Sequence, residues 1–421
     1  MLRRPRLGPA RARPPRSVAS HERVYIGLLY CRSGTEARNN QESQMSATNS
    51  TGSAQFDSLG LKRVINGRSW VTMLGGSRMP AEVQQAMVDA ADTFIDFNEL
   101  NRRAGERLAR YTGAEAGLVV AGASTGLLVQ AAACMAGQDP DRILQLPDTT
   151  GMKDEILIYE KHRFGFEICY RTAGAKLREW GKGEDTLAEQ LAAAINEKTA
   201  AVTYVFGPPF TCDLSLREVV AVAHEQDVPV IVDGAAMLPP ADNLTAYIAD
   251  GADLVTFSGG KGVRGPQSTG ILAGRADLVE AARLNMSPHA SVGRACKVAK
   301  EEIAGLLAAL DRFVSMDHEE EWATWRSWSE TIVAAGDDIA GVRPVIEDGE
   351  SNRQGPTAAF YFDEGWDGPS AVEIQEKLAS GDPSIHVGVG NDVGELHVSP
   401  VALEPGEAEI VAQALRTELG R

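Results

Sequence analysis

The sequence predicts an α/β fold, with a mostly parallel sheet in a large domain and a small α+β domain at the C-terminus. Along residues 51–320, short apolar runs alternate with amphipathic helical stretches, which is typical of a parallel sheet covered by helices. From about Ala299 a long helical pattern continues to about Ala335, and a different, mixed pattern follows it. We therefore expect a large domain with an N-terminal arm over 51–320, and a small domain over 321–421 that a bridging helix reaches.

The composition is that of an ordinary globular protein. Of its 421 residues, 43% are hydrophobic and 24% are charged, which is enough to bury a sizeable core. A formal net charge of -17 would repel the phosphate backbone, so we expect a small-molecule substrate rather than a nucleic-acid partner. No uninterrupted apolar run reaches the roughly 20 residues that span a bilayer, so no membrane segment is expected. The scattered cysteines show no CxxC spacing, which favours a reducing cytoplasm and no metal site.

Residues 1–50 differ from the rest of the chain. Their arginines lie among prolines, and no acidic residue precedes Glu22. A basic, acid-poor start is compatible with a transit peptide, but Pro14 and Pro15 would break the amphipathic helix that such a peptide needs. We expect a disordered basic extension over 1–50, and Met45 is an alternative start of the protein.

The large domain is expected to contain strands that are short apolar runs bounded by Gly, Pro or charged residues. In chain order they are Ala116–Val120, Ile143–Leu146, Ile156–Tyr159, Ala200–Phe206, Val228–Val232, Leu254–Phe257 and Gly270–Ala273. Between them, Asp96–Tyr111 carries apolar residues at helical spacing, and Gly113 is a plausible C-cap. Further helices are expected over Leu127–Met135, Leu214–Gln226 and Leu244–Gly251.

The small domain is predicted from shorter signals. Its expected strands are Ala358–Phe362, Ile385–Val389 and Leu396–Val398, and its expected helices are Ala371–Ala379 and Glu407–Leu419. The alternation of the two types predicts an α+β arrangement.

A glycine-rich lysine segment, Ser258-Gly-Gly-Lys261-Gly262, follows the expected strand Leu254–Phe257 directly. The carboxyl end of such a strand lies at the sheet edge where ligands bind in open α/β folds. The neighbouring glycines leave room around the amine of Lys261 for a bulky planar group. Taken alone, the segment fits a solvated turn lysine equally well.

Asp233 ends the apolar run Pro229–Val232, so we expect it at the same sheet edge as Lys261. A carboxylate after a fully apolar strand is unfavourable unless it is paired. It pairs either with the backbone at a helix N-terminus or with a cationic ring nitrogen, as in enzymes that use pyridoxal phosphate.

The segment Gly122-Ala123-Ser124-Thr125-Gly126 joins an expected strand to an expected helix. Its small residues allow backbone N–H groups at the helix N-terminus to reach a phosphate, with the two hydroxyls as extra donors. Any tight strand-to-helix turn looks similar. In chain order with the later aspartate and lysine, however, this turn predicts a cofactor cradle.

The segment Phe257–Gln267 resembles the lysine motif of the selenocysteine-synthase-like family of pyridoxal-phosphate enzymes, which includes D-glucosaminate-6-phosphate ammonia-lyase and belongs to the aspartate aminotransferase superfamily. Further matches are Met73–Ser77, Leu100–Glu106, Leu146–Thr149, Gly151–Lys153, Val292–Arg294 and Lys300–Ile303. The resemblance covers roughly residues 66–315, and more loosely 404–410. It implies fold type I.

The resemblance also implies roles for single residues. Lys261 would bind the cofactor as a Schiff base and then act as a base, and Asp233 would pair with the ring nitrogen. Ser258 would join Gly122, Ala123, Ser124 and Thr125 in binding the phosphate. His162 would stack on the ring and assist proton transfer, because an imidazole titrates near neutral pH, although a surface histidine is the alternative.

Candidate phosphate or substrate contacts lie near the lysine motif. They are Arg264, Gln267, His289 and Arg294, some of them acting across the interface of a homodimer or dimer-based oligomer. In Leu396–Pro400, His397 stands where many related enzymes carry an arginine that pairs with the substrate carboxylate. A histidine cannot form that two-pronged contact, so it would fall to Arg353, Arg264 or Arg294.

The family resemblance implies a lyase that acts on a β-hydroxylated amino acid or a 2-amino sugar acid and releases ammonia and a 2-keto acid. A racemase or an aminotransferase is an alternative, and so is a selenium transferase acting on seryl-tRNA. Only about 65 residues precede the matched region, too few for the tRNA-binding domain of the bacterial transferase. A non-catalytic scaffold is disfavoured because Lys261 and Asp233 are both present.

Removal of residues 1–44 is expected to leave catalysis unchanged, because that segment lacks apolar periodicity and precedes every matched motif. Steady-state rates of the truncated and full-length proteins test this. A truncated protein that is insoluble or inactive would show that the extension completes a site or an oligomer contact.

Overall fold

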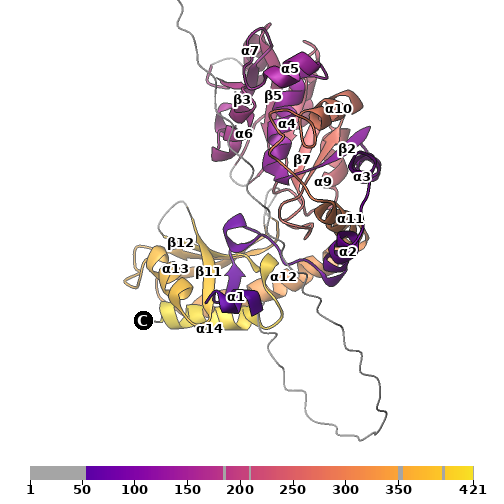
Figure 1. Cartoon of the computed structure of the whole chain (residues 1–421). Coiled ribbons are helices and arrows are strands. Elements are labelled where there is room, and N and C mark those ends of the chain that lie inside the picture. The colour runs from indigo at the N-terminus through magenta and orange to yellow at the C-terminus, as the bar shows by residue number, and fades with distance from the viewer. Residues whose placement is uncertain (1–53, 184–185, 208–209, 349–353, 391–393, 421) are drawn as a thin grey trace, which may run out of the picture. The chain divides into compact units, whose positions relative to one another are not determined.

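The computed structural model describes residues 54–183, 186–207, 210–348, 354–390 and 394–420. Gln55–Arg421 forms one compact unit with two sheets and the helices that pack on them (Figure 1). The extension predicted over 1–50 lies outside the described residues. Within the described part, no helix is both long and apolar enough to cross a membrane.

The large sheet has the strand order β2-β8-β7-β6-β5-β3-β4. Its strands are β2 (Ala116–Val120), β3 (Glu155–Tyr159), β4 (Lys176–Trp180), β5 (Thr199–Val205), β6 (Val230–Asp233), β7 (Leu254–Ser258) and β8 (Gly270–Gly274). Only β8 runs antiparallel to its neighbours in this sheet. The predicted mostly parallel sheet is therefore confirmed, and the carboxyl ends of its other strands share one edge.

Two parts of this sheet differ from the prediction. The run Ile143–Leu146 is not a strand, because most of it lies in helix α5 (Pro140–Gln145). The Asp139 carboxylate accepts hydrogen bonds from the first backbone N–H groups of α5, and Pro140 occupies its first turn, so helix-start chemistry outweighs a short apolar run. Strand β4 was not predicted, because it lies at the edge of the sheet and its charged residues interrupt the apolar pattern.

Helices cover both faces of the large sheet. They are α2 (Ala81–Ala91), α3 (Phe97–Thr112), α4 (Gly122–Ala136), α6 (Ile168–Thr172), α7 (Leu187–Ala194), α8 (Leu216–His224), α9 (Asn243–Ala249), α10 (Ala276–Leu284) and α11 (Lys300–Ser315). One core cluster joins the sheet to α3, α8, α9 and α11, and a second joins its other face to α4 and α10. The predicted C-cap Gly113 ends α3 in the left-handed conformation, with φ 68°.

The predicted bridging helix is two helices rather than one. Helix α11 ends at Ser315, and α12 (His318–Val333) begins after Asp317, whose side chain accepts from the N–H groups of Glu319 and Glu320. Helix α11 packs against α2, whereas α12 packs against strands and helices of the small sheet. Trp325 of α12 is buried against Trp70 in an edge-to-face contact with ring centroids 5.9 Å apart.

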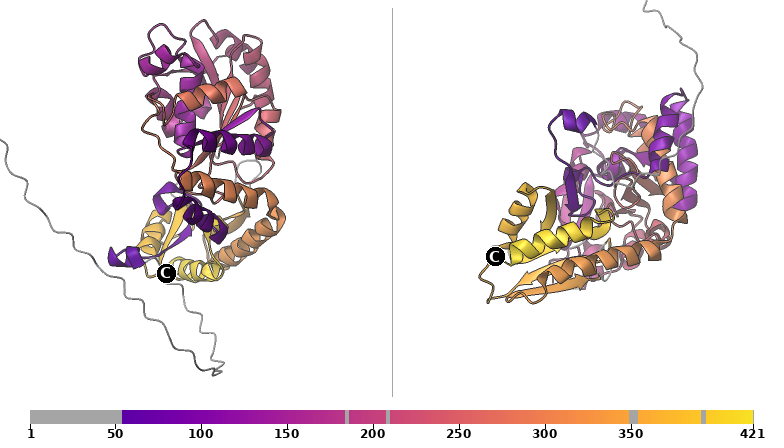
Figure 2. Two further views of the ribbon diagram at one scale, coloured as in Figure 1. Left: turned by 45° about the vertical axis from the view of Figure 1, so that its right-hand side comes forward. Right: turned by 90° about the horizontal axis from the view of Figure 1, so that it is seen from below.

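The small sheet has the order β1-β11-β12-β10-β9. Its strands are β1 (Val64–Gly67), β9 (Val342–Glu347), β10 (Thr357–Phe362), β11 (Ser384–Val389) and β12 (Glu395–Val398), with helices α13 (Ala371–Ser380) and α14 (Glu407–Leu419). Strand β1 pairs parallel with β11 (Figure 2). Residues expected in an arm of the large domain thus add an edge strand to the C-terminal sheet. The boundary at residue 320 stays a prediction.

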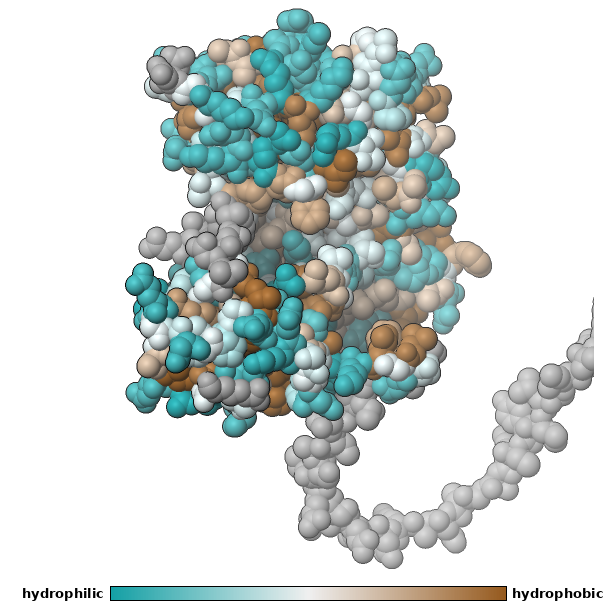
Figure 3. Space-filling model, turned by 90° about the vertical axis from the view of Figure 1, so that its left-hand side faces the viewer, coloured by the Kyte–Doolittle hydropathy of each residue, from teal (hydrophilic) through white to brown (hydrophobic). Residues whose placement is uncertain are grey.

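The surface drawn in Figure 3 is mostly hydrophilic, with apolar residues scattered across it. This agrees with the balanced composition of the chain.

Substitution of Gly126 by Ala is expected to destabilise the protein by about 1–3 kcal/mol, because overpacking distorts a filled core. A Cβ atom on Gly126 of α4 would lie 2.4 Å from Cγ2 of Thr256, which is fully buried in β7. The matched control is Gly165→Ala, where a Cβ atom would meet nothing within 4 Å. Urea unfolding measures both variants, and equal midpoints would contradict the packing account.

Candidate active site

Asp233 and the Lys261 turn lie at the carboxyl ends of neighbouring parallel strands. Asp233 is the last residue of β6 and pairs with Thr256 of β7, and β7 ends at Ser258, just before the lysine turn. The Ser258 N–H donates to the carbonyl of Ala235 at 3.3 Å, which joins the turns after the two strands. The prediction of one shared sheet edge for the aspartate and the lysine is therefore confirmed.

Burial sets the charge states of this pair. The Asp233 side chain is buried, its Oδ1 atom accepts from the Ala235 N–H at 2.9 Å, and burial raises its pKa to about 6. Burial also lowers the pKa of the Lys261 amine, although the charge of Asp233 opposes this change. A lysine with a lowered pKa holds more neutral amine at neutral pH, and the neutral amine is the form that acts as a nucleophile or base.

The conformation of the lysine turn is fixed by its neighbours. A Cβ atom on Gly260 would lie 2.3 Å from Cα of Gln267, so only glycine fits there. The Ser77 hydroxyl donates to the Gly260 carbonyl at 3.0 Å, which links the Met73–Ser77 segment to the lysine turn. The Arg264 N–H donates to the Lys261 carbonyl at 2.8 Å.

The predicted phosphate turn begins helix α4. Gly122 has φ 75°, and the backbone N–H groups that follow it lie in the first turn of the helix, where they lack partners within the helix. The Thr125 hydroxyl donates to the carbonyl of Ala121 at 2.7 Å, and the Ser124 side chain hydrogen-bonds the Cys169 thiol. For Thr125 the backbone N–H is therefore the donor left for an anion, rather than the hydroxyl that the sequence suggested.

His162 is buried rather than on the surface. It follows β3, its exposed fraction is 1%, and the rings of Tyr159 and Tyr204 contact it edge-on. Its Nδ1 atom accepts from the N–H of Val205, the residue that pairs with Asp233 across β5 and β6. Burial lowers the pKa of His162 to about 4, so the ring is neutral at pH 7 and its proton resides on Nε2. This ring is not an acid near neutrality, contrary to the expectation from its ordinary pKa.

A cavity of about 260 Å³ is lined by Lys261 together with residues from the turn after β1 and from the small sheet. Arg68, Ser69 and Trp70 line it from the β1 side, and Gln354, Thr357 and His397 line it from the C-terminal side. His397 thus lies in the same cavity as the lysine, where the resemblance placed it. Arg68, which the sequence reasoning missed, is the arginine among these lining residues.

The predicted substrate contacts that the structure describes do not line this cavity. Arg264 pairs with Glu321 at 2.9 Å and lines a different cavity, and Gln267 donates to the Thr72 carbonyl at 3.3 Å. Arg294 is exposed. Arg353 lies outside the described residues.

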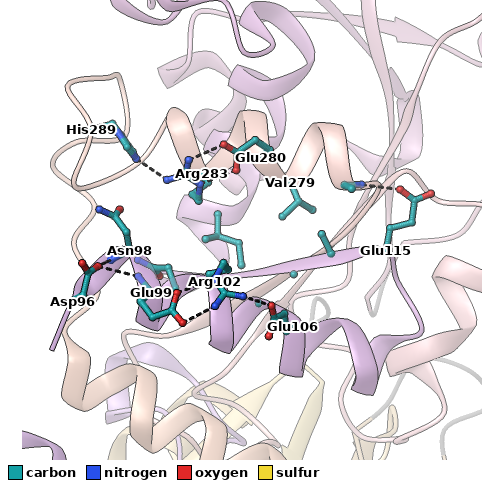
Figure 4. Close-up of a pocket in the computed structure, with 16 residues that line it drawn as sticks. Asp96, Asn98, Glu99, Arg102, Glu106, Glu115, Val279, Glu280, Arg283 and His289 are labelled. Atoms are coloured by element: carbon teal, nitrogen blue, oxygen red, sulfur yellow. Dashed lines mark hydrogen bonds and ion pairs between the residues drawn. The ribbon is translucent and has the colours of Figure 1, made fainter.

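His289 lines a larger cavity, of about 720 Å³, between α3 and α10 (Figure 4). Its Nε2 atom lies 2.9 Å from Nη1 of Arg283. Several charged groups of this cavity pair with one another, as Arg102 does with Glu99 and Glu106. It shares no lining residue with the Lys261 cavity, so its greater volume does not mark the reactive site.

Comparison with known proteins agrees with this geometry. The family described as SelA, L-seryl-tRNA selenium transferase, matches residues 64–327. A 5'-C-glycyluridine monooxygenase-decarboxylase from a Streptomyces species is 32% identical over 86% of this chain and 91% of its own length. A D-glucosaminate-6-phosphate ammonia lyase from Salmonella typhimurium is 31% identical over 86% and 96%.

Two further comparisons concern a solved structure and a relative that matches a smaller share of the chain. A solved structure of D-glucosaminate-6-phosphate ammonia-lyase superposes with a TM-score of 0.75 at 29% identity, covering 88% of this chain and 99% of the other. The selenium transferase of Desulfovibrio desulfuricans is 32% identical but covers 57% of this chain and 52% of its own length. Relatives and fold neighbours are pyridoxal-phosphate enzymes, which confirms the predicted fold type, enzyme class and cofactor.

The pH dependence of stability in the cofactor-free protein is expected to report the buried Asp233. The pKa of Asp233 in the folded protein, about 6, lies above the ordinary value of 3.8. The stability that the protonated carboxyl contributes is therefore fully present below about pH 4 and is lost as the pH rises through 6. The difference corresponds to about 3 kcal/mol. Asp233→Asn removes this loss, so the free energy of unfolding of the variant relative to the parent should rise between these pH values.

Urea unfolding from about pH 4 to pH 8 measures this difference. The control is Asp141→Asn, which removes an exposed carboxylate in α5. Parallel stability curves for the parent and Asp233→Asn would contradict a raised pKa.

Proposed function

Because the chain belongs to the L-seryl-tRNA selenium transferase (SelA) family, we propose that it is a pyridoxal-phosphate-dependent lyase acting on a β-hydroxylated amino acid or a 2-amino sugar acid. The products are ammonia and a 2-keto acid. The observation that carries the proposal is the buried Asp233 beside Lys261, at the sheet edge next to a cavity lined by Lys261 and by residues of the small sheet.

The residues present fit pyridoxal phosphate. Among the described residues, the Asp233 carboxylate receives one backbone N–H and no bonded cation, so a protonated ring nitrogen supplies the partner that a buried carboxylate needs. The backbone N–H groups after Gly122, together with Ser258, suit the phosphate. When bound, the cofactor provides an electron sink for negative charge at the α-carbon of the substrate.

Lys261 moves the protons in the proposed reaction. Its Nζ atom removes the α-proton and delivers it to the β-hydroxyl, which leaves as water. The resulting enamine takes up water again and releases ammonia, so the net change is conversion of the amino acid to a keto acid without a keto-acid acceptor. The lowered pKa of Lys261 favours this role, because the base must be neutral when it accepts the proton.

His162 serves the site as a flat, neutral ring. The Val205 N–H fixes Nδ1 as the acceptor, so Nε2 is left to donate. We propose that His162 packs on the cofactor ring and donates from Nε2. Acid catalysis at neutral pH does not fall to it, because its pKa is about 4.

Oxidative decarboxylation is a second candidate function. A relative named for such a reaction matches this chain at 32% identity, as closely as the ammonia lyase does. The names of both relatives describe amino compounds that contain a sugar or a sugar acid, which supports a polyhydroxylated amino acid as the substrate class. A selenium transferase is less well supported, because the match to the Desulfovibrio desulfuricans enzyme covers 57% of this chain, whereas the match to the ammonia lyase covers 86%.

We further propose a homodimer in the cytoplasm. His289 and Arg294 lie away from the Lys261 cavity of their own chain, and contact with the substrate or phosphate of a partner site would give them the predicted role. Phe94 and Ile95 are exposed apolar residues that suit such an interface. Cys134, Cys169, Cys212 and Cys296 are free thiols, which fits a reducing compartment.

Release of keto acid and ammonia is the test of the proposed reaction. Amino acids and 2-amino sugar acids are supplied with and without 2-oxoglutarate or pyruvate, and both products should form in equal amounts without an acceptor. Lys261→Ala should lower turnover by about 10³-fold or more and remove the visible absorbance of the lysine-bound cofactor, with an unchanged circular dichroism spectrum.

The same assay separates the alternatives. Product that forms only with an acceptor would replace the lyase by an aminotransferase, and inversion without ammonia release would indicate a racemase. Oxygen uptake with release of carbon dioxide would favour the second candidate. Normal activity in Lys261→Ala without added amine would refute the assignment of the lysine.

A further inference from the structure

Arg68 is one of the residues that line the cavity of Lys261. We propose that Arg68 binds the α-carboxylate of the substrate and so takes the place of the arginine that related enzymes carry at the position of His397. This proposal rests on the proposed function, because it assumes an amino acid substrate whose amino group would take the place of Lys261 on the cofactor.

The backbone around Arg68 is fixed by hydrogen bonds. The Asn66 side chain accepts from the Arg68 N–H and donates to the Ser69 carbonyl, both at 2.9 Å. The backbone of Arg68 also forms an isolated parallel β-bridge with Ser399, just after β12. The Ser399 N–H donates to the Gly67 carbonyl at 2.8 Å. The turn that carries Arg68 is thereby held at the edge of the small sheet.

A second set of contacts ties this turn to the loop after Asp233. The Ser69 hydroxyl donates to Oε1 of Gln354 at 2.9 Å, and Nε2 of Gln354 donates to the Ala236 carbonyl at 2.7 Å. Ser69 has φ 75°, a left-handed conformation that is unfavourable for a residue with a side chain. Strained residues held by surrounding hydrogen bonds are concentrated at functional sites, which supports a binding role for this turn.

The charge of Arg68 is not neutralised by the described protein. Its guanidinium contacts the thioether of Met73 at 3.3 Å, and no carboxylate of the described residues pairs with it. The residues lining the cavity include Arg68 and Lys261 but no aspartate or glutamate. A guanidinium has N–H donors in a planar fork that matches a carboxylate, so the cavity is suited to an anion.

The position of Arg68 in the Lys261 cavity favours the α-carboxylate as its ligand over an anionic group farther along the substrate. The α-carboxylate sits on the same carbon as the amino group that would take the place of Lys261 on the cofactor, so both must lie near the cavity of about 260 Å³ that Lys261 lines. A phosphate at the far end of a sugar acid lies several bonds away. Arg264, one of the alternatives that the sequence suggested, is already paired with Glu321.

The test compares ligands that differ only in the carboxylate. D-glucosaminate is matched with its alcohol, 2-amino-2-deoxy-D-glucitol, and L-serine with 2-amino-1,3-propanediol. Dissociation constants come from titration of the visible absorbance of the holoenzyme, with thermal shift as a second readout. Arg68→Gln should weaken binding of the acids by about 10- to 100-fold and leave the alcohols unchanged.

Two further variants sharpen the comparison. Arg68→Lys should restore part of the affinity for the acids, because it keeps the charge but loses the fork. Arg63→Gln removes the same charge five residues earlier, where the guanidinium pairs with Glu407 outside the cavity, and should bind both ligands of each pair as the parent does.

Several results would overturn the proposal. They are equal weakening of acids and alcohols by Arg68→Gln, loss of the cofactor absorbance in that variant, and a parent that binds neither acid better than its alcohol. Loss of only the added affinity for D-glucosaminate 6-phosphate over D-glucosaminate would assign Arg68 to a phosphate instead. If the acids bind through Arg68 but no keto acid forms, the proposed reaction fails and the carboxylate contact stands.

Discussion

A carboxylate buried at the end of an apolar strand is the constraint on which the site depends. Asp233 is almost fully enclosed and receives a single backbone N–H within the described chain, so its burial is unfavourable until a cation lies beside it. The parallel sheet brings the turn of Lys261 next to this carboxylate through the pairing of β6 with β7. The hydrophobic core that enforces the strand order therefore also enforces the electrostatics of the site.

The effects of burial differ among the titratable groups of the site. Asp233 gains affinity for its proton, whereas Lys261 and His162 lose theirs. Each change favours the neutral form of the group, which is the expected effect of a low dielectric. Bound pyridoxal phosphate would reverse the change at Asp233, because a cationic ring nitrogen stabilises the carboxylate. The negative charge of Asp233 would thus be compensated in the protein with bound cofactor, and it is not compensated by a bonded cation of the described protein alone.

Much of the large domain and its site could be predicted from the sequence because the signals are local. The apolar runs of β6 and β7 are short and sharply bounded, and Asp233 and Lys261 follow them directly. The run Ile143–Leu146 misled because an aspartate and a proline before it begin a helix. Arg68 escaped notice because its importance arises from the pairing of β1 with β11, a contact between opposite ends of the chain that no local pattern reveals.

The same pairing has a consequence for the order in which the protein folds during synthesis. Val64 leaves the ribosome early, but Ser384, its partner in the parallel ladder, is made almost last. The edge of strand β1 therefore stays unpaired until nearly the whole chain has emerged. Pairing it with β11 then closes a very long loop, which costs conformational entropy. The large sheet can form around Asp233 and Lys261 before then, because none of its strands comes from the C-terminal part. The wall of the cavity that carries Arg68 is thus assembled last, after the sheet edge that carries Asp233 and Lys261.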